Sequence, residues 1–189
     1  MSQAAFSLAY ARTAIRGPWS WALAAGVVAF TLSTLALGHL PLSLGPVAGL
    51  AVVSLLVSRR LMPALATAPR GSAPLPWWDI PARMLVTTAF VVLLTGAATH
   101  LGPRLTGLLT PFPLYAASLV AFTHALEGPA PAGGVLRGLL LGLYSFVGFF
   151  VVLAALLERT GIAAAFAAAG VAALGIQGTA LWTLRRGVD

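Results

Sequence analysis

The stretch LTGLLTPFPLYAASLVAFTH (residues 105–124) has the apolar character of a membrane-spanning helix, yet two prolines interrupt it. Pro111 and Pro113 stand on either side of Phe112. Proline lacks a backbone N–H group, clashes with the preceding helical turn and keeps the residue before it out of the α conformation. We therefore expect residues 110–112 to be extended and a helix to restart at about Pro113, because proline fits the first turn of a helix.

The composition around this stretch is that of a membrane protein. Of the 189 residues, 59% are hydrophobic and 8% are charged, whereas a soluble domain has about 25% charged residues. The chain has no Cys, which excludes disulfides and thiolate metal sites. The net charge of +7 comes from Arg at the ends of apolar runs, so we interpret it as membrane topology and predict no nucleic-acid binding. The sequence shows no catalytic motif, and we predict no enzyme, no metal site and no cofactor.

Six apolar runs approach the length of about 20 residues that a spanning helix needs. They predict an all-α, multi-pass membrane protein whose single domain comprises residues 1–189. The loops after the first, third and fifth spans are only a few residues long, so we expect three hairpins. The predicted spans are residues 19–38, 40–58, 82–100, 105–126, 137–157 and 162–184.

The distribution of Arg predicts the orientation in the membrane. An even number of spans puts both termini on one side, together with an N-terminal segment (residues 1–17) and a loop at residues 59–81. That side carries nine of the eleven Arg residues, and an excess of positive charge marks cytoplasmic segments. We expect a protein of the bacterial inner membrane with both termini in the cytoplasm.

Asp79 stands at the start of the third span, directly after two tryptophans, in the segment PWWDIPARM (residues 76–84). A carboxylate in that position can accept hydrogen bonds from the free N–H groups of a first helical turn. We predict that Asp79 caps this helix, with a functional role as the alternative.

The break in residues 105–124 is the strongest functional signal. An irregular backbone inside a bilayer is tolerated where protein buries it or where it lines a water-filled cavity. A helix restarting there also points free N–H groups and a partial positive charge at the break. We predict a transporter of a small solute, of which an anion fits best; the alternative is a proline-kinked helix whose carbonyls find other partners. The candidate substrate-binding residues are Arg104, Pro111, Pro113 and Tyr115, with His100 and Gln177 as further candidates.

Small residues in the last two spans favour close helix packing. Gly138 and Gly142 form a GxxxG pattern, and the last span, which contains Gly170, consists largely of Ala and Gly. Such patterns let two helix backbones approach closely. They predict a homodimer or a membrane-protein partner that docks on these spans. The competing function is therefore a non-transporting membrane subunit that scaffolds a partner protein or an envelope complex.

Two neighbouring segments carry a family resemblance. GLLTPFPLYAASLVAFTHALEG (residues 107–128), followed by LRGLLLGLYSFVGFFVVLAAL (residues 136–156), resembles the GlpM-like family of small bacterial inner-membrane proteins. The similarity extends over roughly residues 83–186 and leaves the first two spans unexplained. The resemblance implies a link to glycerol 3-phosphate metabolism and exopolysaccharide production, without an agreed molecular mechanism. An anionic phosphate substrate would agree with the predicted site at the break.

Overall fold

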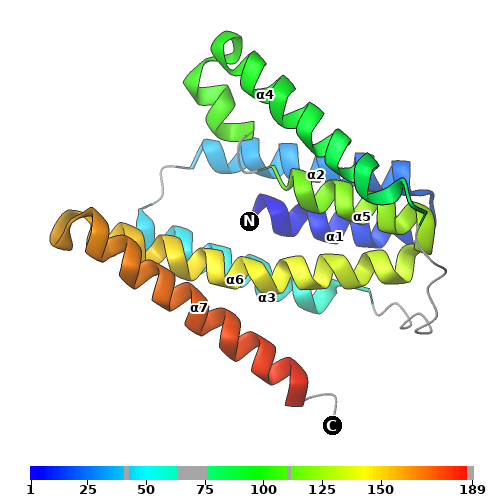
Figure 1. Ribbon diagram of the computed structural model, residues 1–189. Coiled ribbons are helices and arrows are strands. Elements are labelled where there is room, and N and C mark those ends of the chain that lie inside the picture. Colours follow the sequence, from blue (N-terminus) through cyan, green and yellow to red (C-terminus); the bar gives the residue numbers. More distant parts are fainter. Residues whose placement is uncertain (41–42, 64–75, 110–111, 187–189) are drawn as a thin grey trace.

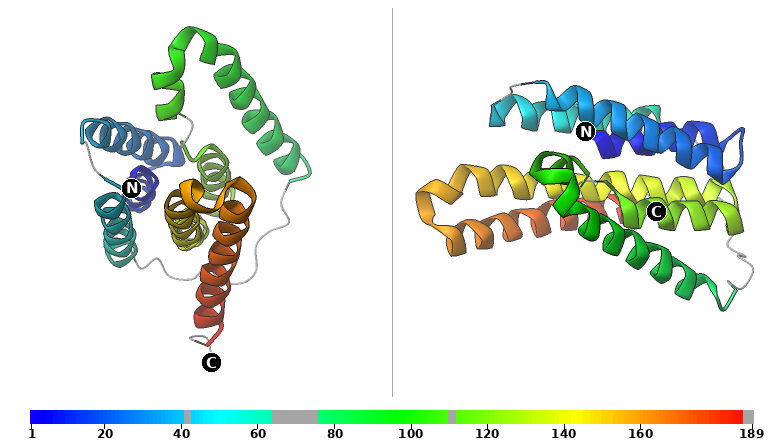
Figure 2. Two further views of the ribbon diagram at one scale, coloured as in Figure 1. Left: turned by 90° about the vertical axis from the view of Figure 1, so that its left-hand side faces the viewer. Right: turned by 90° about the horizontal axis from the view of Figure 1, so that it is seen from above.

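The structure, a computed structural model, describes residues 1–40, 43–63, 76–109 and 112–186. Those residues form α-helices and contain no strand. In chain order the helices are α1 (Ser2–Ala14), α2 (Trp19–Gly38), α3 (Leu44–Leu61), α4 (Asp79–Leu109), α5 (Leu114–Glu127), α6 (Pro129–Thr160) and α7 (Ile162–Arg186). The helices α2, α3, α5 and α6 surround α1, and α4 and α7 lie on the outside of this bundle (Figures 1 and 2).

Four of these helices are long and apolar enough to cross a membrane, namely α2, α3, α6 and α7. Few of their side chains are buried inside the protein, and apolar helices of this length with so little buried surface suit a lipid environment. The chain is therefore an all-helical membrane protein, as its composition predicts. The first, second, fifth and sixth predicted spans correspond to these four helices, and α2 has the predicted bounds, Trp19–Gly38.

The third and fourth predicted spans are not confirmed as two full-length crossings. The helix α4 runs through residues 101–104, where a tight turn was expected, and the ribbon turns back on itself toward its C-terminal end (Figure 1). Pro103 lies within α4, where proline removes a backbone hydrogen bond and bends the helix. The helix α5 has 14 residues, or about 21 Å, which is shorter than a hydrocarbon core of about 30 Å.

The N-terminal segment contains the most deeply buried helix. Residues 1–17 were expected to lie outside the spans, but α1 lies among α2, α3, α5 and α6 (Figure 2). Its buried side chains follow a spacing of three or four residues, which places them on one broad face of a helix, and small residues among them let neighbouring backbones approach. The buried residues are Ala4, Phe6, Ser7, Tyr10, Ala11 and Ala14.

An aromatic cluster joins α1 to the restart of the broken helix. The ring of Phe112 packs edge-on against Phe6 at 6.1 Å and against Phe30 at 5.1 Å between ring centroids. Edge-to-face contacts at such distances are the preferred aromatic geometry. Tyr10 extends the cluster to His124, whose Nδ1 atom lies 3.3 Å from the Tyr10 hydroxyl. The residue between the two prolines is thus an anchor in the core.

The contact between α1 and α2 depends on a glycine. A Cβ atom added at Gly26 would lie 2.8 Å from the Cδ2 and Cε2 atoms of Phe6. Phe6 is fully buried, so its ring has little room to move. In contrast, no described atom lies within 4 Å of a Cβ added at Gly49 on α3.

We expect Gly26→Leu to lower the free energy of unfolding by about 2 kcal/mol, because a side chain forced into a packed interior distorts it. Gly49→Leu is the matched control and should cause no loss. Thermal unfolding of both variants in one detergent measures the difference, and equal midpoints for the two variants would contradict the packing of α1 against α2.

Helices α6 and α7 approach each other closely at a glycine other than the predicted ones. A Cβ atom at Gly148 would collide with the side chain of Ile176 on α7. At Gly138, Gly142 and Gly170, no described atom lies within 4 Å of an added Cβ. The GxxxG pattern is therefore not used for packing within the described part of this chain, and its surface remains open.

Candidate functional site

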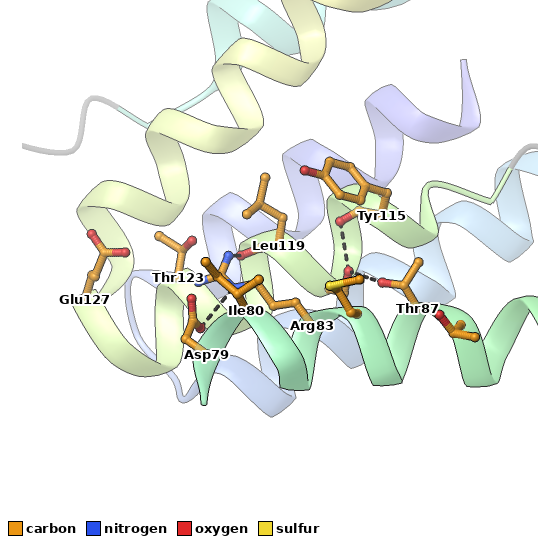
Figure 3. A pocket seen from close by; sticks show the side chains of 11 residues that line it. Asp79, Ile80, Arg83, Thr87, Tyr115, Leu119, Thr123 and Glu127 are labelled. Atoms are coloured by element: carbon orange, nitrogen blue, oxygen red, sulfur yellow. Dashed lines mark hydrogen bonds and ion pairs between the residues drawn. The ribbon is translucent and has the colours of Figure 1, made fainter. Parts of the chain in front are cut away.

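A cleft of about 580 Å³ lies between α4 and α5 (Figure 3). Its volume falls in the range of small-molecule sites, about 300–1,000 Å³. Five hydroxyl-bearing side chains, an arginine and two carboxylates line it among apolar residues, in a chain of which only 8% of the residues are charged. The lining is formed by Asp79, Ile80, Arg83, Met84, Thr87, Thr88, Tyr115, Ser118, Leu119, Thr123 and Glu127.

Antiparallel packing of the two helices builds the cleft. On α4, Asp79, Arg83 and Thr87 follow each other at intervals of four residues, which places them on one face of the helix. The Thr87 hydroxyl lies 3.3 Å from that of Ser118 on α5. One turn toward the start of α4, Arg83 donates from Nη1 to the backbone oxygen of Leu119 at 3.4 Å. These contacts fix which turns of the two helices face each other.

A buried ion pair occupies the wall of the cleft. The Nε atom of Arg83 donates to Oδ1 of Asp79 at 2.9 Å, and the two residues are 17% and 2% exposed in their side chains. The guanidinium carbon also lies 5.4 Å from the centre of the Phe122 ring, in a cation–π contact. The pair is therefore held by α4 and α5 together, and it ties the two helices to each other.

The observed role of Asp79 differs from the predicted helix cap. The helix α4 begins at Asp79 itself, and the carboxylate pairs with Arg83 one turn later. A carboxylate in a first turn still interacts favourably with the positive end of the helix dipole. Asp79 also lines the cleft, which agrees with the alternative prediction of a functional role.

Of the predicted substrate-binding residues, Tyr115 lines the cleft, with 71% of its surface exposed. Pro113 is buried and precedes the first residue of α5, which confirms a restart close to the predicted position. Arg104 and His100 belong to the helical backbone of α4, but their side chains lie outside the described residues, as does the whole of Pro111.

Gln177 lies elsewhere, between α6 and α7. Its Oε1 atom accepts a hydrogen bond from the Ser145 hydroxyl at 2.6 Å. A side-chain amide that bonds a neighbouring helix is a common way to join two helices in a membrane. Gln177 therefore contributes to the pairing of α6 and α7, and it does not line the cleft.

A second cavity, of about 800 Å³, reaches Phe112 beside the helix break. It extends from the first residues of α1 between α2, α3 and α6, and its lining is apolar apart from the N-terminal residues, which include Ser2 and Gln3. On its described side the break thus faces a largely apolar cavity, and the predicted site at the break, whose residues lie partly outside the described ones, stays a prediction. The polar groups gather in the cleft on α4 and α5 instead.

Sequence reasoning missed the cleft residues Arg83, Thr87, Ser118 and Glu127. The signal was present as polar residues at intervals of four in an apolar segment, beginning with Asp79 and Arg83. What the spacing did not reveal is that this face of α4 meets the hydroxyl-bearing face of α5. Among the residues that the structure describes, no three His, Asp or Glu side chains are grouped to hold a metal ion.

Comparison of the chain with family models, with curated proteins and with solved structures found no match. The resemblance to the GlpM-like family therefore stays a prediction.

Proposed function

We propose that the chain is a carrier that transports a small solute across the membrane, and that the solute binds in the cleft between α4 and α5. The observation that supports this proposal is the cleft itself, with its ion pair and hydroxyl groups. Polar and charged side chains are costly within a membrane protein, and they mark substrate pathways there. The wall is also formed by a helix, α5, that is too short to cross the membrane alone.

The proposed location is the bacterial inner membrane, with the connection between α1 and α2 and the C-terminus on the cytoplasmic side, while α1 itself lies among the membrane helices. The Arg distribution supports this orientation. In this arrangement α4 and α5 take the place of the second predicted hairpin, with both of its ends on the same side of the membrane, so the number of crossings stays even. The preference for an anion concerned the helix break, through Arg104 and the start of α5, and it is not part of the proposal for the cleft.

Filling the cleft tests the transport proposal. We expect Thr88→Trp to reduce uptake of the transported solute into proteoliposomes about tenfold or more, because an indole ring would occupy much of the volume that binds the solute. Thr88 is exposed and lines the cleft, whereas its neighbour Ala89 is exposed and does not, so Ala89→Trp is the matched control.

The assay screens phosphorylated, carboxylated and cationic metabolites for uptake above that of empty liposomes. Equal uptake by the Thr88→Trp and Ala89→Trp variants would remove the cleft from the proposal. A screen in which the unmodified protein moves none of the solutes would count against transport altogether.

The second candidate function is a scaffolding subunit without transport activity. It is favoured by the open surface at Gly138, Gly142 and Gly170, where a helix of another chain could approach closely. A second copy of this chain or a partner membrane protein would bind α6 and α7 there. The same surface is compatible with a carrier that works as a homodimer.

A further inference from the structure

We propose that the cleft between α4 and α5 selects an amphipathic organic cation, whose positive group lies at Glu127 and whose apolar body lies on Ile80, Met84 and Leu119. The inference rests on the proposed function for the location of the site, and it adds the chemical class of the ligand. It concerns a different place from the helix break, for which an anion was predicted.

The charges of the cleft favour a cation. Its lining contains three charged side chains, and two of them, Asp79 and Arg83, balance each other at 2.9 Å. Glu127 is exposed and has no ion-pair partner among the residues that the structure describes. The described lining of the cleft therefore carries one uncompensated negative charge, and the arginine in it is already paired with a carboxylate.

The positions of the lining residues match a molecule with one charged end. Glu127 stands at one end of the cleft, and Tyr115 and Thr87 lie toward the other (Figure 3). Along α5, twelve residues separate Tyr115 from Glu127, which is about 18 Å of helix. Between the two ends, Thr123 and Ser118 offer hydroxyl groups on α5.

The cleft also has an apolar surface, to which both helices contribute. Ile80 and Met84 on α4 are exposed, and Leu119 on α5 is half-buried, so all three present hydrocarbon to the cleft. Methionine is flexible and polarizable, and it adapts to apolar bodies of different shape. A fully hydrophilic cation would leave this surface unused, whereas an amphipathic one covers it.

Two probe ions of nearly equal size and opposite charge test the charge preference. Tetraphenylphosphonium and tetraphenylborate both have an apolar body that fits such a wall, so the ratio of their affinities reports the sign of the charge in the site. We measure binding of each ion to the purified, detergent-solubilised protein by equilibrium dialysis. The ratio is then compared between variants, which cancels the partition of the ions into detergent.

We expect Glu127→Gln to lower the ratio of phosphonium to borate affinity about tenfold, since the lost charge acts on the two ions with opposite sign. Glu127→Arg should lower the ratio further, in the same direction. The matched control is Glu158→Gln, because Glu158 is the other glutamate of the chain and lies near the far end of α6. It should leave the ratio unchanged.

An unchanged ratio in both Glu127 variants, with normal thermal unfolding, would overturn the cation assignment. That result is distinguishable from failure of the proposed function. If Thr88→Trp still abolishes solute uptake while the Glu127 variants keep the ratio, the cleft transports a solute of another class. If Thr88→Trp leaves the binding of both probe ions unchanged, the probes bind elsewhere and the assignment also fails.

Discussion

Phe6→Ala is expected to lower the free energy of unfolding by about 4 kcal/mol, because truncation of a fully buried aromatic ring leaves a cavity. The Phe6 residue is 0% exposed, and its ring packs against the rings of Tyr10 and Phe112. The ring also occupies the space that a side chain at Gly26 would need. Its loss removes the contact that connects α1 to α2 and to the restart of the broken helix. An N-terminal segment lying free of the bundle would show no such effect.

The matched control for this variant is Ile15→Ala. Ile15 directly follows α1 and is exposed, so its truncation removes apolar atoms without opening a cavity in the core. Thermal unfolding in a mild detergent, followed by intrinsic tryptophan fluorescence, measures both variants. If Phe6→Ala unfolds at the same temperature as Ile15→Ala, the central position of α1 in the bundle is wrong.

The second large effect concerns the ion pair of the cleft. Arg83→Gln is expected to lower the free energy of unfolding by about 3 kcal/mol, because it leaves a buried carboxylate without its partner charge. Asp79 is 2% exposed, and its Oδ1 atom lies 2.9 Å from Arg83 Nε. The dipole of α4 stabilises the remaining carboxylate in part, since Asp79 stands in the first turn.

The double variant Asp79→Asn with Arg83→Gln separates pairing from packing. It removes both charges and keeps two side chains of similar size, so most of the lost stability should return. Unfolding midpoints of the single and double variants, measured in one detergent, give the coupling energy between the two residues. If the double variant were as unstable as the sum of two single variants, the two charges would not interact as the structure shows.

The spanning helices were predictable because they depend on local properties. A run of about 20 apolar residues must bury its backbone polar groups within one helix when the solvent is lipid. The bounds of α2 followed from this rule, as did the presence of α3, α6 and α7. The restart of helical structure at α5 was predictable from the two prolines, because a proline acts on the backbone of its immediate neighbours.

The role of α1 was not predictable in the same way. Its residues are too few and too polar to be recognised as a span, although Ala4, Ser7 and Ala11 form a stripe of small residues. A stripe of that kind shows which face of a helix can pack closely, but it does not identify the helices that pack against it. In the folded chain α2, α3, α5 and α6 leave a central space, and α1 fills part of it.

The candidate cleft could not be predicted in full, because it depends on the pairing of two helices. Spacing alone places Asp79, Arg83 and Thr87 on one face of α4. Yet Asp79 was expected to cap the helix, with a functional role only as the alternative, and the other two residues were not among the predicted candidates. Tyr115 was a candidate because of its distance from the prolines, and it does line the cleft. The contact between Thr87 and Ser118, 31 residues apart, is what brings the two polar faces together.

The sequence by itself determined that this protein is helical and built for a membrane, and where its chain must break, because hydropathy and proline act within one segment. The tertiary structure alone decided that Phe112 anchors the break in the core, that α1 lies at the centre, and that the polar site lies between α4 and α5. These features arise from contacts between residues far apart in the chain. Such contacts depend on the shape and register of packed helices, which no single segment contains.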